Sequence, residues 1–250
     1  MIEFAGLYKS FDRVPVLRGV DLRVREGETL ALLGPSGSGK SVLLKHAIGL
    51  LEPDAGDVVV DDVSIARASD EELRRVRRLV GYVFQNAALF DSLTVAENLW
   101  LAQDDGSVRR SRAQCREEAA ELLRRVNLDP AIMGKLPGEL SGGMRKRVGV
   151  ARAIASRPRY LLWDEPTTGL DPVNADRIDE MIVELGRDLG VTSIVVTHDL
   201  DTAFDVGDRI ALLYEGRIRA CAAPDAIMEI DDPVVRRFVR RVRVDAPVTA

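Results

Sequence analysis

The stretch Gly34-Pro35-Ser36-Gly37-Ser38-Gly39-Lys40-Ser41 fits the pattern G-x-x-x-x-G-K-[ST] at every required position. It follows the apolar run Thr29 to Leu33, which predicts a strand covered on both faces, as in a parallel sheet. It precedes Val42 to Leu51, where apolar residues recur at helical spacing. Glycines let backbone N–H groups turn inward around an anion, and a helix start presents unpaired N–H groups to it. This strand, loop and helix therefore predict a phosphate-binding site.

Two side chains of the loop suit a nucleotide with its metal ion. Lys40 supplies a mobile positive charge for the β and γ phosphates, and the Ser41 hydroxyl can ligate Mg²⁺. The alternative is a glycine-rich turn with an incidental lysine, which does not account for the order of strand, loop and helix. We expect the nucleotide to contact the loop and the residue after it, namely Gly34, Pro35, Ser36, Gly37, Ser38, Gly39, Lys40, Ser41 and Val42.

The phosphate loop alone would equally suit a kinase or a GTPase, and a second group of residues indicates how the nucleotide is hydrolysed. Tyr160 to Trp163 is an apolar run that predicts a strand, and Asp164 and Glu165 follow it directly. Because the carboxyl ends of parallel strands face the ligand crevice, these acids should lie beside the phosphates. We expect Asp164 to hold Mg²⁺ through water and Glu165 to orient and deprotonate the attacking water. The alternative is that both acids only open a turn before Pro166.

A third constellation is Ser141-Gly142-Gly143, placed before a predicted helix from Arg145 to Ser156. A serine and two glycines at a helix start form an anion-binding terminus. The lysine loop already supplies such a terminus to the chain's own nucleotide. A second one therefore points to the nucleotide of another molecule, although Ser-Gly-Gly is also an ordinary helix start.

The remaining sequence predicts an α/β architecture. Strand and helix patterns alternate, which implies a parallel sheet flanked by helices, and the segment from Asp91 to about Pro137 is mostly helical. Capping boxes at Ser69 with Glu72 and at Thr94 with Glu97 predict helix starts. The net charge of −5 argues against nucleic acid as the main partner. We see no signal peptide, and no apolar run approaches the roughly 18 to 20 residues that cross a bilayer.

These motifs occur in the order and spacing of the ABC (ATP-binding cassette) ATPases, and the chain resembles that family from about Glu3 to Val239. The resemblance implies a P-loop ATPase with a RecA-like parallel-sheet core, an N-terminal antiparallel β subdomain and an inserted α-helical subdomain. The implied domain spans residues 2–239, with the helical insertion at about 91–156 and a C-terminal tail at 240–250. The implied cofactors are ATP and Mg²⁺.

The resemblance also implies roles for individual residues. Phe11 would stack on adenine, and Gln85 would touch Mg²⁺ and sense the partner. Ser141, Gly142 and Gly143 would contact the γ-phosphate bound by a second copy of the chain. Asp171 would lie at the dimer seam, and His198 would steady the γ-phosphate. Taken singly, Phe11 could be a core residue, Gln85 a surface amide and His198 a capping residue.

Three stretches resemble the ATPases of the Mla/Mce family of bacterial phospholipid transport: Phe84 to Val95, Glu139 to Arg147 and Asp232 to Phe238. Met144 stands where the ABC signature usually has Gln, which bears on the subfamily. The likeness implies an ATPase at the cytoplasmic face of the inner membrane that powers lipid transport through separate permease subunits, with a lipid-binding Mce-type protein in the complex. The alternatives are the ATPase of a small polar-solute importer and a cytosolic ATPase of the iron-sulfur assembly type.

The basic end of the chain remains open to three interpretations. Arg236, Arg237, Arg240, Arg241 and Arg243 alternate with apolar residues. They could form a basic face near anionic lipid, a strap onto the neighbouring ATPase subunit, or a solvated and partly disordered end. The transported substrate and the direction of transport depend on subunits that are not in this chain.

Overall fold

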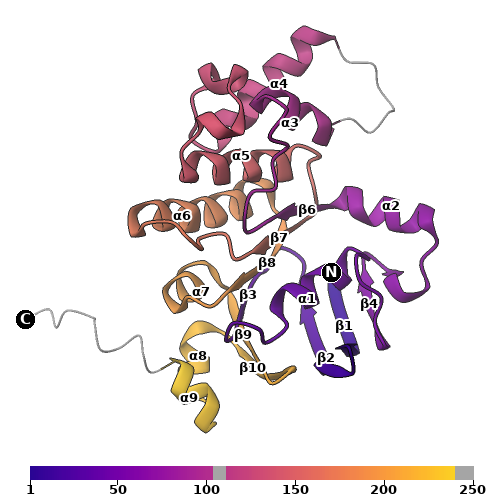
Figure 1. Cartoon of the computed structure of the whole chain (residues 1–250). Helices are drawn as coiled ribbons and strands as arrows, with labels where there is room; N and C mark the ends of the chain where they lie inside the picture. The colour runs from indigo at the N-terminus through magenta and orange to yellow at the C-terminus, as the bar shows by residue number, and fades with distance from the viewer. Residues whose placement is uncertain (104–110, 240–250) are drawn as a thin grey trace, which may run out of the picture.

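A six-stranded sheet forms the centre of the molecule in the computed structural model, which describes residues 1–103 and 111–239 (Figure 1). The strand order is β10-β9-β3-β8-β7-β6, and all neighbours are parallel except β9 with β10. The strands are β3 (Thr29–Leu33), β6 (Val80–Val83), β7 (Tyr160–Asp164), β8 (Thr192–Thr197), β9 (Arg209–Tyr214) and β10 (Arg217–Ala222). Every residue of β3, β7 and β8 is buried, which is typical of strands with helices on both faces. The predicted parallel-sheet core is confirmed.

The N-terminal part of the chain builds a second, antiparallel sheet. Its order is β2-β1-β4-β5. The strands are β1 (Ile2–Phe11), β2 (Val14–Val24), β4 (Ala55–Val60) and β5 (Val63–Ser64). In β2, Val20, Leu22 and Val24 are buried whereas Asp21 and Arg23 are exposed, which is the alternation of a sheet with one face in the core. The expected antiparallel β subdomain is therefore present.

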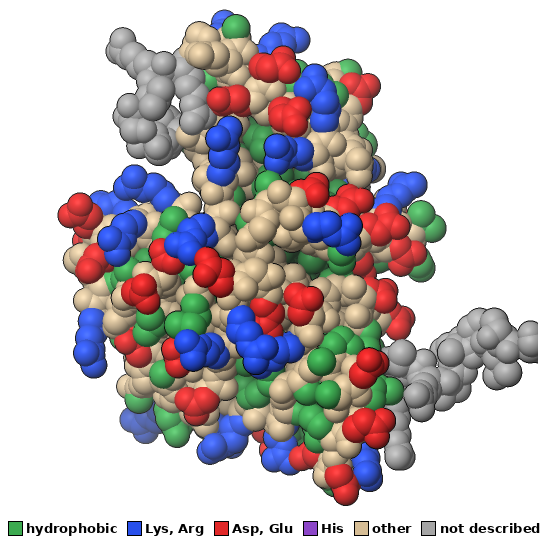
Figure 2. All heavy atoms as spheres, turned by 180° about the vertical axis from the view of Figure 1, so that it is seen from behind, with side chains coloured by type: hydrophobic (Ala, Val, Ile, Leu, Met, Phe, Trp, Pro, Cys, Tyr) green, Lys and Arg blue, Asp and Glu red, His purple; other side chains and the backbone are tan. Residues whose placement is uncertain are grey.

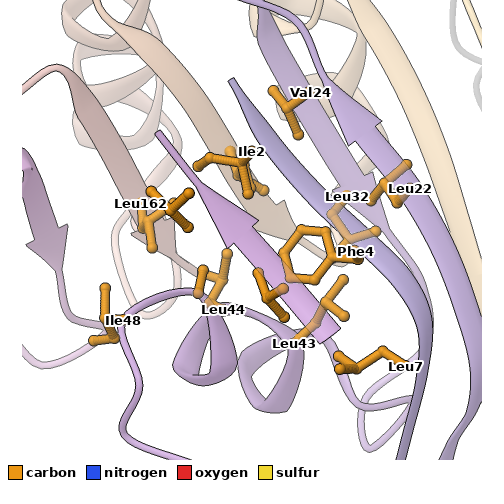
Figure 3. Packing of buried hydrophobic residues seen from close by; sticks show 14 of the residues in the cluster. Ile2, Phe4, Leu7, Leu22, Val24, Leu32, Leu43, Leu44, Ile48 and Leu162 are labelled. Atoms are coloured by element: carbon orange, nitrogen blue, oxygen red, sulfur yellow. The ribbon is translucent and has the colours of Figure 1, made fainter. Parts of the chain in front are cut away.

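Helix α1 (Lys40–Ala47) joins the two sheets into one core. Its residues Leu43 and Leu44 are fully buried in a cluster with Phe4 of the antiparallel sheet and Leu32 of the six-stranded sheet (Figure 3). Burying a leucine or phenylalanine side chain contributes roughly 1.5–3 kcal/mol. Both sheets therefore pack against the apolar side of α1. This packing fixes the position of the loop that precedes the helix.

Four helices extend from one end of the sheet (Figure 1). They are α2 (Asp70–Leu79), α3 (Val95–Gln103), α4 (Arg112–Arg125) and α5 (Gly142–Ile154). Ser69 caps α2 with the predicted capping box, and the Thr94 hydroxyl accepts a hydrogen bond from the Glu97 backbone N–H at the start of α3. Buried Leu99, Leu123 and Val148 from these helices share an apolar cluster with the sheet. The helical insertion expected from the sequence is therefore packed on the core.

The second half of the chain adds helices around the sheet. They are α6 (Pro172–Leu189), α7 (Leu200–Val206), α8 (Pro224–Met228) and α9 (Pro233–Val239), together with the short 3-10 helices η2 (Pro130–Gly134) and η3 (Pro137–Glu139). A further 3-10 helix, η1 (Ile65–Arg67), follows β5 in the first half. Asp171 caps α6, and Gly190, with φ 60°, ends it. Strands β9 and β10 pair as an antiparallel hairpin.

Two predicted helix boundaries were wrong by a few residues. The helix expected at Val42–Leu51 runs from Lys40 to Ala47, because Gly49 turns the chain away with φ 63°. The helix expected at Arg145–Ser156 begins at Gly142 and ends at Ile154. The Ser141 hydroxyl accepts a hydrogen bond from the Met144 backbone N–H, so both glycines belong to the first turn of the helix.

The surface is polar and of mixed charge. In Figure 2, which shows the molecule from behind, basic and acidic side chains are interspersed over the visible face. None of the helices in the described part of the chain combines the length and the hydropathy needed to cross a lipid bilayer. The tail at 240–250, with Arg240, Arg241 and Arg243, lies outside the described residues.

Candidate functional site

The predicted site residues meet at one edge of the six-stranded sheet. Strands β3, β6, β7 and β8 are parallel, so their carboxyl ends lie at the same edge. Gly34 follows β3, Gln85 follows β6, Glu165 follows β7 and His198 follows β8. This arrangement converts four separate stretches of sequence into one cluster of side chains.

The loop Gly34–Ser41 wraps closely around the start of α1. A Cβ on Gly34 would lie 2.3 Å from the Leu213 carbonyl oxygen, so no side chain fits there. Gly39, with φ 102°, precedes the first residue of α1 in a conformation that glycine tolerates best. The Ser38 hydroxyl is buried and has no hydrogen-bond partner in the described structure. An orphaned hydroxyl inside a loop of backbone N–H groups fits a bound phosphate oxygen.

Lys40 is the buried cation of the loop, with only 4% of its surface exposed. Its Nζ donates hydrogen bonds to the carbonyl oxygens of Gly34 at 2.8 Å and Pro35 at 3.1 Å. It also lies 3.7 Å from Glu165 Oε1. Burial lowers the pKa of Lys40, and the neighbouring carboxylates of Glu165 and Asp164 oppose that shift. The ammonium is therefore held between the loop and the acids at the end of β7.

Asp164 lies at the end of β7 and joins two hydroxyl groups. Its Oδ1 accepts a hydrogen bond from Ser41 Oγ at 2.6 Å, and its Oδ2 accepts one from the Tyr82 hydroxyl at 2.9 Å. Burial and the Asp164 carboxylate raise the pKa of Tyr82, which keeps this hydroxyl a donor. The sequence analysis missed Tyr82. Its place in an apolar strand, one strand away from Asp164, was the only signal.

The oxygen ligands expected for Mg²⁺ fit that ion chemically. Ser41 and Asp164 are in contact, and both offer oxygen atoms, as does the amide of Gln85. No group of three or more His, Cys, Asp or Glu residues in the described ranges is arranged to hold a metal ion by itself. This suits Mg²⁺, which is usually bound by one or two carboxylates together with substrate phosphates.

Glu165 contacts several other side chains of the cluster. Its Oε2 accepts a hydrogen bond from Thr168 Oγ1 at 3.1 Å and one from Gln85 Nε2 at 3.4 Å, and it lies 3.5 Å from His198 Nδ1. The backbone of Glu165 has φ 49°, a left-handed conformation that is uncommon outside glycine. Strained backbone of this kind concentrates at functional sites. The structure thus brings Lys40, Gln85 and His198 together around this carboxylate.

The loop after Gln85 is held by α5. Ala87 and Ala88 both have positive φ, at 59° and 48°, so the chain turns sharply there. Arg152 of α5 donates from Nη1 to the Ala88 carbonyl oxygen at 2.6 Å and from Nη2 to the Ala87 carbonyl oxygen at 3.1 Å. The position of Gln85 is therefore tied to the helix that begins at Ser141.

The tip of α5 forms a second region, together with the start of α6. Ser141 and Gly142 are exposed, and Gly143 lies against Asn174, whose Oδ1 would be 3.0 Å from a Cβ at Gly143. Asn174 Nδ2 donates to Asp171 Oδ2 at 2.6 Å. The hydrogen bonds from the Asn174 side chain and backbone lower the pKa of Asp171. Asp171 and the Ser-Gly-Gly tip are thus linked through Asn174.

Phe11 lies at the end of β1, where it pairs with Val14 in the hairpin of β1 and β2. Its ring is 41% exposed and lies 5.5 Å from Lys9 Nζ. The hairpin reaches the phosphate loop through Val16, whose Cγ1 would lie 3.0 Å from a Cβ at Gly39. Phe11 is therefore a solvent-facing aromatic residue on a strand pair that touches the loop.

A family model described as ABC transporter matches residues 17–168. The chain belongs to the ABC transporter family. It is similar to the probable ribonucleotide transport ATP-binding protein mkl of Mycobacterium tuberculosis, at 37% identity over 243 residues that cover 97% of this chain and 67% of that protein. It is 40% identical to the methionine import ATP-binding protein MetN of Caulobacter vibrioides over 248 residues, which cover 98% of this chain and 74% of that protein.

Solved structures of this family share the fold. The dimeric structure of MJ0796, a bacterial ABC transporter cassette, matches with a TM-score of 0.84 and 33% identity, over 90% of this chain and 99% of that one. A structure of MJ0796 in a post-hydrolysis state, bound to ADP and Pi, matches with a TM-score of 0.83. The ABC chain described here is therefore an ATPase subunit of a transporter, and ATP with Mg²⁺ is its nucleotide.

Proposed function

We propose that two copies of this ABC chain clamp ATP between them and that hydrolysis powers lipid movement through a separate membrane permease. The observation that carries the proposal is the cluster at the sheet edge, where Lys40 lies 3.7 Å from Glu165 and the Ser41 hydroxyl donates to Asp164. The tip Ser141–Gly143 supplies the second half, because Ser141 and Gly142 are exposed at the start of α5, where the first backbone N–H groups of a helix lack intrahelical partners.

Each residue then has a distinct part in hydrolysis. The loop Gly34–Ser41 binds the phosphates through backbone N–H groups, and Lys40 neutralises the β and γ phosphates. Ser41, Gln85 and Asp164 would hold Mg²⁺, which when bound would supply positive charge at the phosphate oxygens. Glu165 accepts a proton from the attacking water.

The remaining residues complete the nucleotide site. His198 lies within 3.5 Å of Glu165 and donates to the γ-phosphate. Phe11 stacks on the adenine of the nucleotide, which its exposed ring at the end of β1 permits. Ser141, Gly142 and Gly143 contact the γ-phosphate held by the partner copy, and Asp171 lies at the seam between the copies.

The permease is proposed to dock on the helical subdomain. Phe90, in the loop after Gln85, and Leu101, on α3, are large apolar side chains that are each 52% exposed. The loop between them is rigid, because buried Asn98 bonds to the backbone of Phe90, Leu93 and Thr94. A permease segment on this surface would act on Gln85 through the loop, and the ATPase would sit at the cytoplasmic face of the inner membrane.

The lipid substrate is proposed from the Mla/Mce likeness of Phe84 to Val95, Glu139 to Arg147 and Asp232 to Phe238. In the last stretch, Asp232 caps α9 and Val235 is fully buried, so its residues serve packing against the core. In the second stretch, Met144 packs its partly buried side chain against the apolar cluster beneath α5. The partners proposed on this basis are a permease and a lipid-binding Mce-type protein.

The test is purification of the native complex from membranes, followed by mass spectrometry of its proteins and of extracted lipid. A permease, an Mce-type protein and stoichiometric phospholipid are expected. A permease with a solute-binding protein and no lipid would favour the polar-solute importer, an alternative that the relatives named for methionine and ribonucleotide transport keep open. Recovery with soluble proteins alone would contradict both transport proposals and favour a cytosolic assembly ATPase.

A further inference from the structure

Lys146 lies on α5 and makes contacts that the functions above do not explain. Its Nζ donates hydrogen bonds to the carbonyl oxygens of Pro166 at 2.7 Å and Thr168 at 2.5 Å. Both carbonyls belong to the short loop that follows Glu165. An ammonium group carries three N–H donors and can therefore fix the relative position of two carbonyls in one turn. Lys146 thus clamps the loop that carries the proposed general base.

The loop after Glu165 determines where the Glu165 carboxylate lies. Glu165 has φ 49°, and side chains held in such conformations persist only where the surroundings enforce them. Thr168 carries the constraint back to the carboxylate, because its Oγ1 donates to Glu165 Oε2 at 3.1 Å. A continuous path therefore runs from Lys146 through the Thr168 backbone and side chain to the Glu165 carboxylate.

Lys146 is not needed to hold α5 in place. The helix buries Val148, Val150, Ala151 and Ile154 against the core, and this apolar face anchors it. Burial lowers the pKa of Lys146, and the charge of Glu165 works against that shift. The partly buried ammonium thus costs desolvation energy that the helix could avoid with an apolar residue, which argues for a role beyond packing.

We propose that Lys146 is a positioning residue that keeps Glu165 aligned for hydrolysis and links it to the tip of α5. Since α5 begins at the Ser141 cap, a displacement of its tip reaches the Glu165 loop through one side chain. The inference rests on two parts of the proposed function, namely Glu165 as the general base and the α5 tip at the partner's nucleotide. Lys146 would let each chain sense the partner's ATP at its own hydrolytic carboxylate.

The experiment compares Lys146→Met with Lys135→Met, which removes an exposed lysine elsewhere in the helical subdomain. Steady-state kcat and KM, the Kd for ATP and the Tm are measured for each purified chain. Lys146→Met is expected to lower kcat about 10- to 100-fold, the scale of a misplacement of about 1 Å, with KM and Kd within about two-fold of wild type. Lys135→Met should match wild type. A kcat for Lys146→Met within two-fold of wild type would overturn the inference.

A double-mutant cycle with Glu165→Gln separates this inference from the proposed function. If Lys146 acts through Glu165, adding Lys146→Met to Glu165→Gln should slow turnover by less than about three-fold further. Independent, multiplying losses would reject the link. If Glu165→Gln alone leaves turnover unchanged, the proposed function fails instead. If Lys146→Met does not fold, Lys146→Gln replaces it, because Gln retains an N–H donor without the charge. Its kcat is expected to lie between those of wild type and the range given for Lys146→Met, and a kcat within two-fold of wild type would again overturn the inference.

Discussion

The lysine loop and the tip of α5 are both helix N-termini suited to anions, yet they are built differently. The lysine loop is interlocked with distant parts of the chain: Lys40 lies beside Glu165, and Ser41 bonds to Asp164, 123 residues away. At the tip, Ser141 caps its own helix, and the nearest neighbour is Asn174. The lysine loop lies against acids and expected metal ligands of its own chain, whereas the tip presents a capped helix start.

This difference teaches how one chain can contribute to two nucleotides. A site that performs chemistry needs charged groups fixed in low-dielectric surroundings, and the buried Lys40 and Asp164 meet that need. A surface that only completes a neighbour's site needs exposed N–H donors and little else. The comparison predicts that a change at the loop disables the nucleotide site of its own chain, whereas a change at the tip disables the site of the partner copy.

The largest effect is expected for Glu165→Gln. Removing the proposed general base should slow turnover by roughly 10²- to 10⁴-fold while the amide preserves the shape of the site and ATP binding. Single-turnover hydrolysis and the Kd for ATP check both parts. Undiminished turnover would show that Glu165 is not the general base. The site at the lysine loop would then have no more claim to perform hydrolysis than the tip of α5.

Mixing two inactive chains tests whether the tip serves a partner. Lys40→Ala should disable the loop of its own chain, and Ser141→Arg should block the tip. In a heterodimer, one site combines both defects and the other combines two intact halves. An equal mixture should regain about a quarter of wild-type activity, because random pairing gives half heterodimers with one competent site of two. No recovery beyond the sum of the separate chains would contradict the shared site.

The loop could be predicted from the sequence in more detail than the tip could. The pattern Gly34–Ser41 carries its own mechanism, and the neighbouring run Thr29–Leu33 matched β3 to the residue. Asp164 and Glu165 followed from the rule that parallel strands end at one edge. By contrast, Ser-Gly-Gly alone does not distinguish an interface from an ordinary helix start, and the resemblance to a family was needed to interpret it.

Residues that act through three-dimensional proximity were not predictable. Tyr82 is one of several apolar-strand residues until β6 and β7 pair and bring it to Asp164. Lys146 looks like a solvated helix lysine until its distance to Pro166 and Thr168 is known. The predicted end of the helix after the lysine loop was wrong for a similar reason. The left-handed turn at Gly49, which ends that helix early, depends on the packing of α1 between two sheets. Sequence patterns report local structure, and such contacts join residues far apart in the chain.

A buried contact between α6 and α7 links the two regions more weakly. Asp179 of α6 accepts a hydrogen bond from Thr202 Oγ1 at 2.9 Å, while its Oδ1 has no partner in the described structure. Because α6 begins at Asp171 and α7 follows His198, this contact joins the tip region to the loop region. Burial raises the pKa of Asp179 to about 6, with a smaller contribution from nearby aspartates and an opposing one from Thr202.

A raised pKa predicts the direction in which stability changes with pH. The folded state binds a proton at Asp179 near pH 6 and the unfolded state only near 4, so the contribution of Asp179 to the free energy of unfolding should rise as the pH falls from 8 to 5. Asp179→Asn removes this charge, and it should stabilise the chain at pH 8 by about 1–3 kcal/mol and flatten the pH dependence. Urea unfolding at several pH values measures both. A variant less stable than wild type at pH 8 would show that the ionised carboxylate is favoured where it lies.

The smallest effect separates capping from phosphate contact at the tip. Ser69 and Ser141 are matched caps, since each hydroxyl accepts a hydrogen bond at 3.3 Å from the backbone N–H three residues on. Either serine replaced by alanine should lower the free energy of unfolding by about 1 kcal/mol. Only Ser141→Ala should also slow ATP hydrolysis, because Ser69 lies on α2, away from both nucleotide-binding regions. Equal stability losses with equal, unchanged ATPase rates would mean that the Ser141 hydroxyl caps its helix and does not meet a phosphate.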